Sequence, residues 1–183
     1  MRIIYIITFT ESIFMKTVKI EKNERFTYEG VEVLRCRICF EYPGEKSEIE
    51  NFYQKCADNA YEFVKSTLLP MANEAYENDT DERKRFRFAP FRYQLLGTVT
   101  LDTEYFSQRL DVALSRNGEI LDSFTDGQVF DTERELLVPK NVVLRNLGFL
   151  RDKRVKKAES VLLFFDGISV LKKGKWERIR KVT

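Results

Sequence analysis

The hydrophobic pattern of this 183-residue chain changes its period partway along, and that change limits the folds open to it. Between residues 49 and 64 apolar side chains recur every three to four positions, which is typical of an amphipathic helix. From residue 86 to 95 they recur at about every second position, with a bend at Pro90, which is typical of half-buried strands. A chain with both periods in separate stretches is predicted to be an α+β protein.

The helical stretch has recognisable signals at both ends. Its apolar stripe consists of Ile49, Phe52, Cys56, Ala60 and Phe63, widened by Tyr53, Ala57 and Val64. Tyr42-Pro43-Gly44 ends the preceding strand, and Ser47 is predicted to cap the helix. Pro70 lacks an amide donor and is predicted to kink or divide the helix.

Turn residues divide the rest of the chain into short elements. Two strands, 17–22 and 31–41, precede the helix, and Asn117-Gly118 and Asp126-Gly127 predict two turns in its second half. Further elements are a short helix from Pro139 to Leu147, a hairpin at Asp166-Gly167 between Val161–Phe165 and Ile168–Leu171, and a last strand around Trp176 and Ile179. The sequence therefore predicts one domain over 1–183, with one long, Pro-kinked helix packed on a mainly antiparallel β-sheet and a short second helix.

The first residues need separate treatment. The apolar run from Ile3 to Phe9 is too short to span a membrane and is followed by no cleavage site for a signal peptide. Met15-Lys16 begins an ordinary charged sequence. Residues 1–14 are interpreted either as a misassigned translation start or as an extra strand. Both interpretations predict a cytoplasmic protein that does not associate with membranes.

The chain contains no histidine, which excludes several kinds of catalytic site. Ser-His-Asp triads, Cys-His pairs, His-ligated zinc and the usual general base near neutral pH all need that residue. Cys36 and Cys39 lie three positions apart in a predicted strand, so they point to opposite faces and fit neither a disulfide nor a shared metal. With Cys56 they are interpreted as ordinary thiols. We predict no catalytic, cofactor-binding or metal-binding residue and no cofactor.

Charge is distributed unevenly along the chain. From residue 140 onward there are 13 Lys or Arg and 4 Asp or Glu, a net charge of +9, whereas the whole chain carries +2. The first 139 residues therefore carry −7. Such asymmetry is typical of a surface that binds an anionic partner. The candidate binding residues are Lys153, Arg154, Lys156, Lys157, Lys172, Lys173, Lys175 and Arg178.

The order of strands and turns resembles a known domain family. The residues that carry the resemblance are Tyr42-Pro43, Asn117-Gly118, the run Asp126–Asp131 and the closing hairpin Val161–Val170. The order is similar to that of an uncharacterised bacterial domain family found in the extracellular part of a lysozyme-sensing anti-sigma factor and beside some polysaccharide deacetylases. Family members commonly carry a glycine-rich segment with a histidine before the middle strands, and many are exported, whereas this chain has no histidine and shows no export signal. The resemblance implies a fold and a tendency to bind proteins, without an activity and without lysozyme binding.

These observations leave three functional hypotheses. The leading one is a non-catalytic protein-interaction module with a basic C-terminal surface, which should expose a broad basic or apolar face. The alternative is a carboxylate-based hydrolase of a glycan-like polymer, which needs a deep cleft with converging acids. Its candidate acids are Asp102, Glu104, Asp126, Asp131, Glu133 and Glu135. The second alternative, the less favoured, is single-stranded nucleic-acid binding, because basic residues alternate with aromatic ones between residues 83 and 93. Those residues are Arg83, Lys84, Arg85, Arg87 and Arg92.

Overall fold

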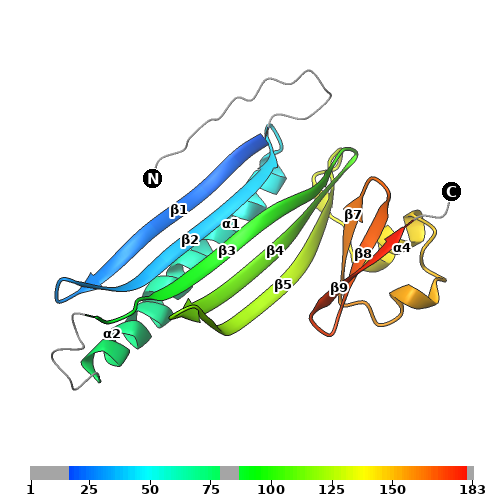
Figure 1. Cartoon of the computed structure of the whole chain (residues 1–183). Helices are drawn as coiled ribbons and strands as arrows, with labels where there is room; N and C mark the ends of the chain where they lie inside the picture. The colour runs from blue at the N-terminus through cyan, green and yellow to red at the C-terminus, as the bar shows by residue number, and fades with distance from the viewer. Residues whose placement is uncertain (1–16, 79–86, 181–183) are drawn as a thin grey trace.

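A computed structural model describes residues 17–78 and 87–180 and shows an α+β architecture (Figure 1). A curled six-stranded sheet has the strand order β1-β2-β3-β4-β5-β6, and a three-stranded sheet has the order β7-β8-β9. One long helical segment lies along one face of the large sheet. The predicted fold class is therefore confirmed. The predictions for residues 1–14 and Met15 lie outside the described residues.

The first two strands form a long antiparallel hairpin. β1 (Thr17–Tyr28) and β2 (Val31–Pro43) both extend beyond the predicted ranges, so that Asn23, expected in the turn, lies within β1. The turn consists of Glu29 and Gly30, whose φ angles of 49° and 77° are the positive values that a tight hairpin turn requires.

The long helix is one continuous segment with a widened turn in its middle. It comprises α1 (Ser47–Phe63), a π-helical stretch η1 (Val64–Leu68) and α2 (Leu69–Glu77). The N–H of Leu69 donates to the carbonyl of Val64, five residues earlier. Pro70 explains this turn, because in a regular α-helix its ring would collide with the carbonyl four residues before it.

The beginning of α1 differs from the prediction. Ser47 is the first helical residue, and Lys46 occupies the cap position without a side-chain hydrogen bond. The backbone N–H of Glu48 instead donates to Oε2 of Glu135 at 2.8 Å, so a residue far along the chain supplies the missing acceptor.

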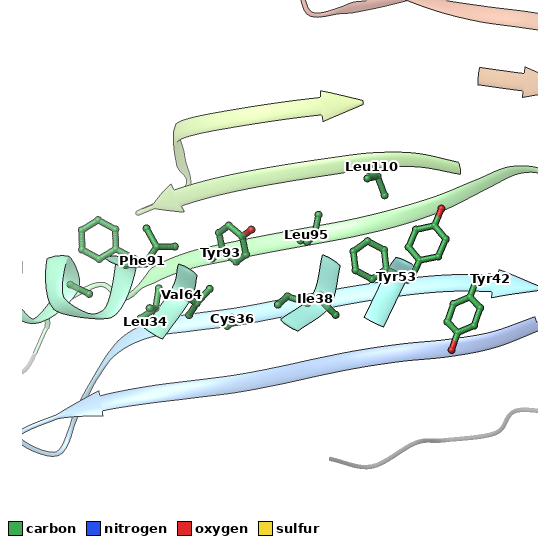
Figure 2. Packing of buried hydrophobic residues seen from close by; sticks show 14 of the residues in the cluster. Leu34, Cys36, Ile38, Tyr42, Tyr53, Val64, Phe91, Tyr93, Leu95 and Leu110 are labelled. Carbon is green, nitrogen blue, oxygen red and sulfur yellow. The ribbon is translucent and has the colours of Figure 1, made fainter. Parts of the chain in front are cut away.

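The main core lies between this helix and the large sheet (Figure 2). Ile49, Tyr53, Ala57 and Val64 are fully buried, whereas Phe63 is 45% exposed. The residues predicted to widen the stripe are therefore its centre. On the sheet side, Leu34, Cys36 and Ile38 project from β2 toward the helix.

The helix connects the first hairpin to a meander. β2 and β3 (Phe91–Asp102) are parallel, which needs a crossover connection of this length. β4 (Tyr105–Arg116) and β5 (Glu119–Asp131) follow as antiparallel neighbours. The predicted turn at Asn117-Gly118 is confirmed, with φ angles of 54° and 83°.

The predicted turn at Asp126-Gly127 is wrong, because both residues lie within β5. Gly127 has a different role there. A Cβ atom at this position would lie 2.6 Å from the carbonyl oxygen of Val161, so the glycine permits close approach of the small sheet.

The last part of the chain forms the small sheet and its cover. Before it, β6 (Leu136–Leu137) completes the large sheet. The elements that follow are α4 (Lys140–Asn146), the 3₁₀ helix η2 (Lys153–Val155), β7 (Ser160–Phe164), β8 (Gly167–Lys172) and β9 (Lys175–Arg180). The predicted helix and hairpin are confirmed, although α4 starts one residue after Pro139. A second core includes Val129 of β5 and Val143 of α4, so the two sheets share buried residues.

Side-chain hydrogen bonds also join the sheets. The N–H of Leu163 donates to Oγ of Ser107 at 2.9 Å, and Nε1 of Trp176 donates to Oγ1 of Thr125 at 3.0 Å. No helix in the described residues is both long and apolar enough to cross a membrane.

Candidate functional site

Seven of the eight predicted basic residues come from two segments that the fold brings together. One segment contains η2 and the turn after it, and the other contains the β8–β9 turn. Glu159 links them, because its N–H donates to the carbonyl of Leu171 at 2.8 Å and its Oε1 accepts from the N–H of Lys173 at 2.7 Å. Lys157, two residues before Glu159, and Lys173, whose N–H binds the Glu159 carboxylate, are thus brought to the same end of the small sheet.

Local sequence signals produce this arrangement. Asp152 caps η2, with Oδ1 accepting from the N–H of Arg154 at 2.8 Å. Val155 and Ala158 are buried in the second core and anchor the segment between them. Lys157 and Lys173 have φ angles of 63° and 49°, so both mark sharp changes of chain direction.

Three of the eight basic residues are engaged in ion pairs. Arg154 pairs with Asp152 at 2.7 Å, Lys172 pairs with Glu177 at 2.8 Å, and Arg178 pairs with Asp166. The hydrogen bonds from Arg154 lower the pKa of Asp152 below its usual value. Charges used in this way are less available to a partner.

Arg178 also lies apart from the others. Its guanidinium stacks on Phe164, 3.5 Å from the ring centroid, beside the β7–β8 turn and at the opposite end of the small sheet from the β8–β9 turn. Five exposed lysines remain, and none forms an ion pair with another described residue. We call this set the lysine surface: Lys153, Lys156, Lys157, Lys173 and Lys175.

The cysteines lie as predicted. Cys36 is buried under the helix, Cys39 is half-buried on the opposite face of β2, and Cys56 is half-buried, all three as free thiols. Burial raises the pKa of Cys36 to about 11 and also raises the pKa values of Cys39 and Cys56. Within residues 17–78 and 87–180 no group of three or more ligand-type side chains is arranged to hold a metal ion.

Several predicted carboxylates gather at one end of the large sheet, where the β3–β4 turn meets the loop after β5. The hydroxyl of Thr132 joins these loops by donating to the carbonyls of Thr103 and Glu104. Asp131 accepts from the N–H groups of Glu133 and Arg134, which gives it a turn-forming role. Two of the predicted carboxylates at this end therefore have structural contacts, Asp131 in its own turn and Glu135 with the N–H of Glu48.

Asp102 and Asp126 differ from the other predicted acids. Burial raises the pKa of Asp102, and its Oδ1 has no hydrogen-bond partner among the described residues. Asp126 lies farther back in β5, where Oδ1 accepts from the N–H of Gly127 at 2.7 Å. Asp102 is therefore the predicted acid that combines a raised pKa with a buried oxygen that has no partner among the described residues.

The alternation of basic and aromatic residues has a packing explanation. Phe91 and Tyr93 are nearly fully buried on the helix-facing side of β3, and Arg92 between them is exposed. Their rings are covered by α1 and α2 and present no platform for stacked bases. Residues 83–85 of the predicted basic set lie outside the described residues.

Two features were missed by sequence reasoning. Gln108 is fully buried on the helix-facing side, where Gly97 leaves room for its side chain and Nε2 donates to the carbonyl of Glu41 at 2.5 Å. On β5, Ile120 and Phe124 are exposed rather than covered. Neither feature follows from the local sequence, because the pattern of a strand does not show which layers cover its faces.

Comparison with known proteins supports the fold and gives no activity. No family model and no curated protein matches the sequence. A solved structure of a DUF3298 family member from Bacteroides fragilis is similar with a TM-score of 0.55 and 13% identity, covering 85% of this chain and 82% of that one. A DUF3298 family protein from Pseudomonas aeruginosa has a TM-score of 0.48 and 11% identity, covering 85% and 81%. The fold is thus similar to one found in an uncharacterised domain family, as predicted, whereas the likeness to the anti-sigma factor stays a prediction.

Proposed function

We propose that the protein is a non-catalytic interaction module that binds an acidic protein partner through the lysine surface. The observation that carries this proposal is the attachment of the segment that follows η2 to the β8–β9 turn through Glu159. This attachment brings the lysine surface, whose five exposed ammonium groups form no ion pair with the described residues, toward one end of the small sheet. A dense positive field of this kind accelerates association with a negative surface and selects against other basic proteins.

The anchoring of the lysine surface also favours binding. Val155 and Ala158 belong to the second core, and the β8–β9 hairpin is paired along its length. The backbone beneath the lysines is therefore held in place before a partner arrives, and only side-chain freedom is lost on binding. Preorganised positive charge fits an acidic protein segment better than scattered exposed lysines would.

Charge reversal provides the test. The variant Lys157→Glu/Lys173→Glu changes the lysine surface, and Lys55→Glu/Arg92→Glu reverses two exposed charges elsewhere as a matched control. We expect poly-L-glutamate to bind the unmodified protein and the control equally, and the first variant at least about ten-fold more weakly, measured by titration calorimetry. Equal binding by all three proteins would refute the proposal.

Two further probes separate the alternatives. A single-stranded oligonucleotide of the same net charge that bound more tightly than poly-L-glutamate, with strong salt dependence, would favour nucleic-acid binding. Release of sugars from a glycan, lost in Asp102→Asn, would favour the carboxylate hydrolase, because Asp102 has the raised pKa expected of a general acid. Either result would replace the interaction module as the leading function.

A further inference from the structure

The outer edge of β5 is unpaired over its first half. β4 pairs with β5 on one side from Glu119 to Asp131, with a register shift at Leu121. On the other side, β6 pairs only with Phe130 and Asp131, and the N–H of Val138 donates to the carbonyl of Val129. The next outward position, Gly127, is bonded in both directions to the hydroxyl of Ser160, at 3.0 Å from its N–H and 2.8 Å to its carbonyl. No described strand pairs with this edge before Gly127.

The orientation of the unpaired backbone follows from these bonds. Gly127 and Val129 direct their N–H or C=O groups away from β4. Backbone groups in an antiparallel strand alternate sides at each residue, so Thr125 and Ser123 direct theirs outward as well. Their four N–H and C=O groups form a short template to which another strand can be added.

Exposed apolar side chains accompany this backbone. Ile120, Leu121 and Phe124 are 68%, 52% and 60% exposed, which is unusual for a strand of a folded sheet. Phe124 lies opposite Val112 on the helix-facing side, at the margin of the main core. A partner strand at this edge would cover apolar surface as well as satisfy the backbone.

The charges along the edge identify the kind of strand that fits. Glu119, Asp122 and Asp126 share the helix-facing side with Phe124, and none of the three forms an ion pair with another described residue. Two copies of β5 paired antiparallel about Phe124 would place Asp122 of one opposite Asp126 of the other, and opposed like charges are unfavourable. In an added antiparallel strand, basic side chains two residues before and two residues after the residue opposite Phe124 would lie across from Asp126 and Asp122, and a third, two residues further on, would lie near Glu119.

We propose that the edge of β5 from Glu119 to Thr125 binds an extended segment of another protein as an added antiparallel strand. On its helix-facing side the segment carries Lys or Arg at alternate positions and an apolar residue opposite Phe124. The added strand ends where Ser160 occupies the edge at Gly127. This site is separate from the lysine surface and takes a partner of opposite charge. A negative result for acidic partners at the lysine surface would therefore not count against strand addition at β5.

Synthetic peptides test the proposal. The probe is acetyl-Lys-Thr-Phe-Thr-Lys-Thr-Lys-amide, and its control replaces each Lys with Glu. We expect the basic peptide to bind the unmodified protein, measured by titration with a fluorophore on the peptide, and the acidic one to bind at least about ten-fold more weakly. The variant Glu119→Lys/Asp122→Lys should reverse this preference. No binding of the basic peptide, or an unreversed preference, would overturn the proposal.

A backbone variant separates strand addition from charge attraction alone. Ser123→Pro removes an N–H that points away from β4, so the β4–β5 ladder stays intact while the edge loses a donor. Ser123→Ala is the matched control and keeps the N–H. We expect Ser123→Pro to weaken the basic peptide about ten-fold and Ser123→Ala to leave it unchanged, with unaltered circular dichroism in both. Equal binding, or a dimer in sedimentation that Ser123→Pro dissociates, would overturn the proposal, the latter by assigning the edge to a second copy.

Discussion

Among single residues, the three thiols show how burial sets reactivity. Cys36 is 1% exposed beneath the helix, and burial raises its pKa to about 11. At about pH 8 we expect it to stay protonated and to resist iodoacetamide in the folded protein, and to react readily in urea, where its pKa returns to about 8.5. Timed labelling with mass spectrometry measures this. Labelling of Cys36 as fast as that of half-buried Cys39 in the folded state would contradict it.

The sequence predicted some residue-level features and could not predict others. The opposite directions of Cys36 and Cys39 follow from the two-residue period of a strand, which needs no tertiary information. The bond from Glu48 to Glu135 joins residues 87 positions apart. Nothing local to either residue indicates that contact, because it exists only once the loop after β5 reaches the start of α1. The separation of Arg178 from the lysine surface likewise depends on tertiary structure, because the pairing of β9 with β8 carries Arg178 toward the β7–β8 turn.

Among the elements, α1 depends on a cap that lies outside its own segment. Replacing Glu135 by Ala removes the carboxylate that accepts from the N–H of Glu48, and with it a negative charge near the positive end of the helix dipole. We expect the free energy of unfolding to fall by ~1 kcal/mol, measured by urea denaturation. Glu133→Ala, two residues away and exposed, is the control and should change stability little. Equal losses in both variants would show that Glu135 is no cap.

Element prediction succeeded where period and turn chemistry agreed. The helix, the Asn117-Gly118 hairpin and the β7–β8 hairpin all combine a clear hydrophobic period with residues suited to the adjoining turn. Asp126-Gly127 has the composition of a turn but lies inside β5. The glycine is needed there because the small sheet packs closely against it. Local sequence cannot distinguish a glycine needed for positive φ from one needed for close packing.

For the whole molecule, the perturbed groups predict sensitivity to alkaline conditions. Burial raises the pKa of Cys36 to about 11 and that of Tyr93 to about 12, and a hydrogen bond to Glu24 raises the pKa of Tyr61 to about 12. As the pH rises above about 9, the unfolded chain loses these protons before the folded one, so the folded state loses relative stability. We expect the urea midpoint to fall between about pH 9 and 11, and to fall less in Tyr93→Phe. A constant or rising midpoint would contradict this.

The attachment of the small sheet to the large one depends on Gly127. A Cβ there would lie 2.6 Å from the backbone oxygen of Val161 and 2.9 Å from the ring of Trp176, and a backbone atom inside a strand cannot move aside. Gly127→Ala should therefore push the sheets apart and cost about 1–3 kcal/mol, measured by urea denaturation. Hydrogen exchange should quicken at the amide of Leu163, which donates to Ser107 across the same junction.

Gly97→Ala is the matched control, because its Cβ would also meet an atom 2.5 Å away, but that atom is the end of the Gln108 side chain within the large sheet. This second variant should lose stability as well, since Gln108 is fully buried and has little room to move. Its strain stays on the helix-facing side, so exchange at Leu163 should follow only the change in global stability. Two outcomes would show that the two sheets are not held together at Gly127. One is exchange at Leu163 in Gly97→Ala that is faster than its loss of global stability explains. The other is exchange at Leu163 in Gly127→Ala that is no faster than its loss of global stability explains.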